Sequence, residues 1–143
     1  MPKIDWNRIL LGGLVAGIVV NFCEYIISGV LLRDDWERAL LALNRPLVSS
    51  VMQTAALQVW GFLMGFSGVA LYAHLCDRYH SGWRTACRAG LAVWIVGYLS
   101  GSVTGASMGV FPASLAIEST IAGLFEILLA TALGAHLYQF ARK

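Results

Sequence analysis

The sequence has little charge for its length. Only 13% of the 143 residues are Asp, Glu, Lys or Arg, whereas 58% are hydrophobic, and the mean hydropathy is +0.69. Soluble domains carry roughly a quarter charged residues. We therefore expect an integral membrane protein that is surrounded by lipid and binds no nucleic acid.

Patterns for metal, cofactor and hydrolytic chemistry are also lacking. Cys23, Cys76 and Cys87 form no evident disulfide pair and show no paired zinc-ligand spacing. His74 and His136 fall near the same end of two apolar segments, but a helical wheel does not place them for a shared haem. The glycines lie within apolar segments, so no phosphate-binding loop is predicted. We expect no metal, no cofactor and no catalytic residue.

Four apolar segments are long enough for the roughly 20 residues that a bilayer core requires. They cover residues 9–32, 51–75, 89–110 and 115–138. Short connections join them, and little sequence is left over. The sequence therefore predicts an all-α fold, an antiparallel four-helix bundle that forms one transmembrane domain over residues 1–143.

A short amphipathic surface helix is predicted between the first two spans. Asp34 and Glu37 have the spacing of a capping box, and Trp36, Leu40 and Leu43 fall on one face of the helix that follows. An apolar face of this kind lies on a membrane surface.

The distribution of Lys and Arg predicts the orientation in the membrane. One side has seven basic residues and the other has three, namely Arg33, Arg38 and Arg45. Basic residues in short loops favour the cytoplasmic side. We expect a multi-pass protein of the bacterial inner membrane, with both termini in the cytoplasm.

A stripe of glycines runs along the third span at every fourth position. Such small residues let a neighbouring membrane helix approach closely, so we expect the stripe to form a helix contact. Similar spacing marks packing positions on the other spans. The predicted packing residues are Gly13, Gly17, Gly61, Gly65, Gly97, Gly101, Gly105, Gly109 and Gly123.

Two carboxylic acids fall deep inside predicted spans. At 1.5 Å per residue, Glu24 lies roughly 22 Å from the cytoplasmic start of its span, and Glu126 lies roughly 18 Å from the cytoplasmic end of its own. They could meet, and no Lys or Arg lies at that depth. We expect compensation by a shared proton or by a hydrogen bond from Asn21, Gln58 or Tyr98. These five residues form the candidate proton or ligand site.

These observations leave three functions open. Buried acids can clamp helices together as neutral hydrogen-bond donors, which favours a small structural or accessory subunit that forms a homo-oligomer or joins a larger membrane complex. The alternative is a proton-coupled carrier of a small solute that uses Glu24 and Glu126. A small membrane enzyme is the third.

The first 46 residues carry a family resemblance. The segment DWNRILLGGLVAG at 5–17, followed by Glu24 and by LRDDW at 32–36, resembles uncharacterised small four-span bacterial membrane proteins. The resemblance covers mainly residues 5–46. It implies a four-span membrane protein and no particular activity.

Overall fold

The computed structural model describes residues 5–45 and 50–140, and all regular structure in these two ranges is helical. Four helices are long and apolar enough to cross a membrane: Trp6–Leu31, Val51–Tyr79, Trp83–Ser107 and Ala113–Phe140. This confirms the prediction of an all-α protein with four helices that are long and apolar enough to span a membrane. Each helix is somewhat longer than its predicted apolar segment because polar turns extend its ends.

Two of the four long helices contain a π-helical segment. The chain runs through α1 (Trp6–Ile26), η1 (Ile27–Leu31), α2 (Arg33–Ala42), α3 (Val51–Tyr79), α4 (Trp83–Trp94), η2 (Ile95–Leu99), α5 (Ser100–Ser107) and α6 (Ala113–Phe140). The π-helical segment η1 ends the first span, and η2 joins α4 to α5. A π segment adds one residue to the helical repeat, so side chains beyond it face a different direction.

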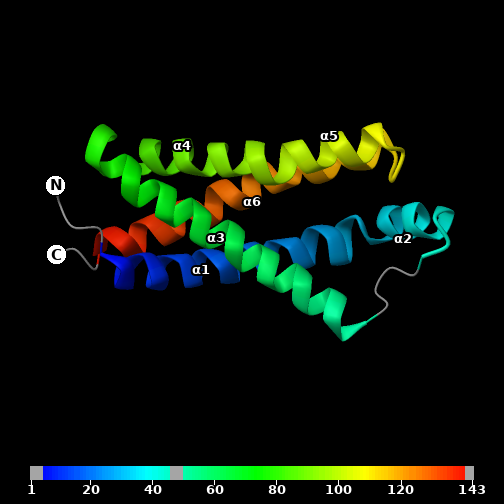
Figure 1. Cartoon of the computed structure of the whole chain (residues 1–143), viewed down its shortest axis with the longest axis horizontal. Helices are drawn as coiled ribbons and strands as arrows, with labels where there is room; N and C mark the ends of the chain where they lie inside the picture. The colour runs from blue at the N-terminus through cyan, green and yellow to red at the C-terminus, as the bar shows by residue number, and fades with distance from the viewer. Residues whose placement is uncertain (1–4, 46–49, 141–143) are drawn as a thin grey trace.

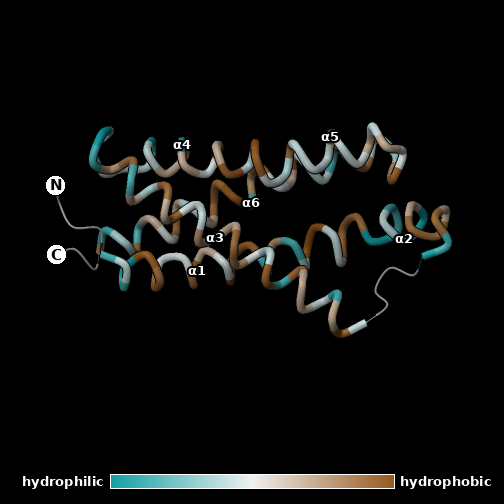
Figure 2. The backbone as a smooth tube through the Cα atoms, in the orientation of Figure 1, coloured by the Kyte–Doolittle hydropathy of each residue, from teal (hydrophilic) through white to brown (hydrophobic). Residues whose placement is uncertain are grey.

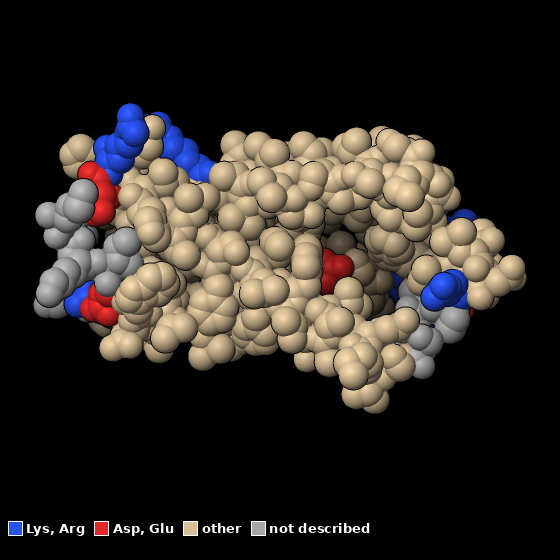
Figure 3. All heavy atoms as spheres, in the orientation of Figure 1, with Lys and Arg blue, Asp and Glu red and all other residues tan. Residues whose placement is uncertain are grey.

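The two ends of the molecule carry most of its charge. The start of α1, the end of α6 and the α3–α4 turn lie at one end, the terminal end, while α2 and the α5–α6 turn lie at the other, the α2 end (Figure 1). Hydrophilic residues concentrate near these ends (Figure 2). Lys, Arg, Asp and Glu also gather there on the face drawn in Figure 3. An apolar middle between charged ends suits a protein that crosses a bilayer.

The surface helix α2 has the predicted position but a different beginning. It begins at Arg33 after Leu32, with no side-chain cap, and Asp34 lies within its first turn. The predicted capping box of Asp34 and Glu37 is therefore wrong. Trp36 packs edge to face on Phe111 of the α5–α6 turn, with ring centroids 5.4 Å apart, and this contact holds α2 against that turn.

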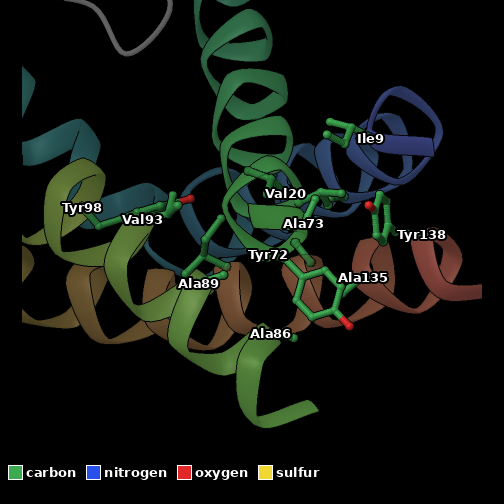
Figure 4. Packing of buried hydrophobic residues seen from close by; sticks show 14 residues of the cluster. Ile9, Val20, Tyr72, Ala73, Ala86, Ala89, Val93, Tyr98, Ala135 and Tyr138 are labelled. Carbon is green, nitrogen blue, oxygen red and sulfur yellow. The ribbon is translucent and has the colours of Figure 1, made fainter. Parts of the chain in front are cut away.

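The terminal half of the molecule is tightly packed around small residues. An added Cβ at Gly12 would lie 2.6 Å from the carbonyl oxygen of Gly134, and one at Gly65 would overlap the backbone nitrogen of Gly17. The backbone of α1 therefore lies directly against α6 and α3. Val20 and Tyr72 are fully buried in the same cluster (Figure 4).

Four of the nine predicted packing glycines, Gly13, Gly17, Gly61 and Gly65, lie at the contact between α1 and α3. A Cβ at Gly13 or Gly17 would overlap Phe66 or Phe62 of α3, and one at Gly61 would lie 2.8 Å from the side chain of Asn21.

The glycine stripe of the third span does not form the expected helix contact along its length. A Cβ at Gly97 would lie 2.7 Å from Met64 Sδ of α3, and one at Gly105 would meet Phe111, but at Gly101 and Gly109 it would meet no heavy atom within 4 Å. Gly109 lies beyond the end of α5, with φ of 68°. Among the described residues of this chain, the stripe therefore contacts a neighbouring helix at Gly97 but not at Gly101 or Gly109.

Candidate functional site

Glu24 and Glu126 come together in the middle of the molecule. They lie on α1 and α6, two helices that pack directly against each other. Glu126 is only 2% exposed, and Glu24 is half-buried. Their carboxyl groups are close enough to interact. The two acids that the sequence places at similar depth thus form one carboxyl pair.

Each acid accepts a hydrogen bond from a hydroxyl group. The Tyr98 hydroxyl donates to Glu126 Oε1 at 2.6 Å, and the Ser28 hydroxyl donates to Glu24 Oε1 at 2.6 Å. The second oxygen of Glu126, Oε2, is buried and has no hydrogen-bond partner among the described residues. A buried polar atom without a partner is costly, so this oxygen marks a place where a proton or ligand could bind.

Both hydroxyl groups come from π-helical segments. Ser28 lies in η1, and Tyr98 lies in η2. Short π segments within α-helices are rare and occur often at functional sites. Each member of the carboxyl pair thus accepts a hydrogen bond from a hydroxyl group on a π-helical segment.

Aromatic side chains enclose the Tyr98 side of the pair. The ring of Trp60 on α3 meets Tyr98 edge to face, with centroids 5.0 Å apart. On the other side, a Cβ at Gly123 would overlap the Tyr98 ring. Gly123 of α6 therefore makes room for Tyr98, and Trp60 covers it from α3.

The remaining predicted site residues have a different role. Asn21 Nδ2 donates to the backbone carbonyl groups of Gly17 at 2.9 Å and Gln58 at 3.2 Å. Asn21 thus links α1 to α3, whereas Gln58 contributes its backbone and is itself exposed. Of the three predicted donors to the acids, Tyr98 is the one that the described structure shows bonded to a carboxyl group.

Among the residues that the structure describes, none supplies a compensating positive charge beside the carboxyl pair. In the described ranges, the two ion pairs are Arg8 with Asp5 at the terminal end and Arg38 with Asp35 in α2. The titratable neighbours of the pair are Tyr98 and Cys23. In Figure 3, acidic atoms are visible at the bottom of a hollow in the otherwise uncharged middle of the molecule. The site is therefore acidic, with Glu126 buried and Glu24 half-buried.

Comparison with protein families, curated proteins and solved structures finds no match to this chain. Function is therefore inferred from the site itself. The sequence predicted both acids and Tyr98, because ionisable residues within apolar segments stand out. It could also have indicated the Ser28 bond, since Ser28 follows Glu24 by one helical turn. The two π segments carry no comparable signal.

Proposed function

We propose that the protein is a proton-linked carrier of a small solute, in which Glu24 and Glu126 exchange a proton for that solute. The observation that carries this proposal is the buried Oε2 of Glu126, which accepts no hydrogen bond from a donor group of the described residues, in a carboxyl group that interacts with that of Glu24. Two adjacent carboxylates without a counter-charge repel each other and are costly inside a membrane. A proton or an incoming group must therefore satisfy the pair.

The π-helical segments support a site that changes its hydrogen bonds during a cycle. Rearrangement of η2 to regular α-helix would rotate Tyr98 relative to α4 and withdraw its hydroxyl from Glu126. The tightly packed terminal half would form one closed barrier, while the hollow would give access from the α2 end.

Proton-linked flux through vesicles tests the carrier directly. The purified protein, reconstituted with a pH gradient, is expected to move protons when solutes of a broad panel are added, and protein-free vesicles provide the control. A wild-type protein that shows no proton-linked flux with any member of the panel would count against the carrier.

A structural or accessory subunit is the second candidate, and the open part of the glycine stripe favours it. α5 has no buried residue, and a Cβ at Gly101 would meet nothing within 4 Å. Glycines on a lipid-facing helix weaken the helix unless another helix packs there. A second copy or another subunit could supply that contact. Stoichiometric co-purification of a larger complex in mild detergent would favour this role over an isolated carrier.

The arrangement in the membrane is part of the proposal. We propose an antiparallel four-helix bundle of the bacterial inner membrane, with the terminal end in the cytoplasm and α2 outside. The excess of basic residues at the terminal end supports this orientation. Reporter fusions at both termini are expected to report cytoplasm, and a tag near Leu43 is expected to be external. A periplasmic C-terminus would contradict this orientation.

A further inference from the structure

We infer that the solute is an amphiphilic amine, and that it reaches the carboxyl pair sideways from lipid, through a gap between α3 and α5 at the α2 end. This inference rests on the proposed function, because it names the solute and the route for the same site.

The gap arises because α3 leaves the third span halfway along its length. Every residue from Val51 to Val59 is exposed, whereas the buried residues of α3 begin at Gly61. α3 packs against α4 but makes no comparable contact with α5 within the described ranges. Figure 1 shows the beginning of α3 sloping away from the rest of the molecule. Lipid can therefore reach the space beside α5.

The gap ends at the residues that cover the carboxyl pair. Gly97 faces the sulfur of Met64, and Tyr98 faces the ring of Trp60. At these residues α3 is therefore in contact with the third span. The Tyr98 hydroxyl bonds Glu126 directly beneath. A molecule that entered between α3 and α5 would therefore meet two aromatic rings and then the acids.

The charge of the site selects a cationic head group. The hydroxyl groups of Ser28 and Tyr98 donate hydrogen bonds to the two acids. In the described spans, no basic side chain forms an ion pair with either acid. Carboxylate oxygens and aromatic faces both attract an ammonium group. When a protonated amine binds, one proton leaves the carboxyl pair for water at the α2 end, so the charge of the site is unchanged.

The surroundings of the gap select an apolar tail. The exposed residues that begin α3 include Val51, Met52 and Leu57, and exposed residues of the third span include Val96 and Val103. A small hydrophilic cation would have to leave water to cross this surface, whereas the tail of an amphiphile could remain in lipid. The head group would then lie at the carboxyl pair and the tail between α3 and α5.

Two matched probes test the solute class and the route. Full-length protein in lipid nanodiscs is titrated with a fluorescent dodecyl chain that carries either a primary amine or a sulfonate. We expect the amine to bind at least about tenfold more tightly than the sulfonate, and Glu126→Gln to remove most of that difference. Equal binding of both probes would overturn the assignment of an amine.

The route is tested by filling the gap. Gly101→Phe is expected to weaken amine binding by about tenfold, because an added Cβ there would meet nothing within 4 Å and the ring would extend into the open space beside α5. Leu133→Phe, at a 44% exposed position on α6, is the matched control and should bind as the wild type does. Unchanged binding in Gly101→Phe, with retained folding, would overturn the lateral route.

The outcomes separate this inference from the proposed function. If protons move with other solutes but the amine probe does not bind, the amine assignment fails and the carrier stands. If the amine binds without proton release in wild-type protein, the proton exchange fails while the site for an amine stands. Binding that releases protons and is lost in both Glu126→Gln and Gly101→Phe supports the whole inference.

Discussion

Replacing Gly65 with leucine is expected to separate α1 from α3 and to destabilise the protein by about 3 kcal/mol. A Cβ at this position would overlap the backbone nitrogen of Gly17 and lie 2.7 Å from the backbone carbon of Ala16. Backbone atoms cannot turn aside as a flexible side chain can, so the helices themselves must move. Thermal unfolding in mild detergent measures the loss.

Gly101→Leu is the matched control for this substitution. It adds the same side chain to a membrane-spanning glycine, but its Cβ would meet nothing within 4 Å. We expect an unfolding temperature near that of the wild type. Equal losses in the two variants would contradict the packing described for α1 and α3. A change of assembly size in Gly101→Leu alone would favour the accessory role.

Replacing Glu126 with glutamine is expected to abolish proton-linked flux while folding survives. Glutamine keeps the shape of the side chain and can still accept the hydrogen bond from Tyr98, but it cannot exchange a proton. Flux in reconstituted vesicles should therefore fall to the level of protein-free vesicles. Circular dichroism and the unfolding temperature report whether the variant remains folded.

Glu24→Gln and the double variant extend the same test. Glu24 is the second member of the pair and accepts from Ser28, so we expect its replacement to stop proton exchange as well. Full proton-linked flux in the double variant would rule out this pathway. Suppose instead that neither the wild type nor any variant shows flux, and that the double variant keeps its assembly and its cellular phenotype. That result would favour a structural role, in which the two neutral acids hold helices together by hydrogen bonds.

The sequence was sufficient for the elements whose signal is local. Each membrane-spanning helix is marked by its own apolar residues, and the depth of Glu24 and Glu126 follows from counting along a helix. The short helix was located correctly, but its beginning was not: α2 begins at Arg33, with only Leu32 between it and the end of η1 at Leu31. Because α2 starts that early, Asp34 already lies within its first turn and cannot be the residue that caps it.

The glycine stripe shows where counting along one helix fails. A spacing of four predicts one continuous face only if the helix is regular, whereas η2 shifts the direction of residues beyond Ile95. Gly109 lies in a turn, and α3, which packs against α4, makes no comparable contact in the described ranges with α5, where Gly101 lies. The direction of a neighbouring helix depends on contacts elsewhere, such as those of Gly17 with α3, which no pattern within the third span reveals.

The most direct test of the carboxyl pair is infrared spectroscopy of the acid groups in the membrane. We expect the wild-type protein to show the carbonyl band of a protonated carboxylic acid that is shielded from water. This band should be absent in Glu126→Gln. Adding the amine probe should decrease this band as the proton leaves. A wild-type spectrum without such a band, or one that Glu126→Gln leaves unchanged, would contradict a proton held by Glu24 and Glu126.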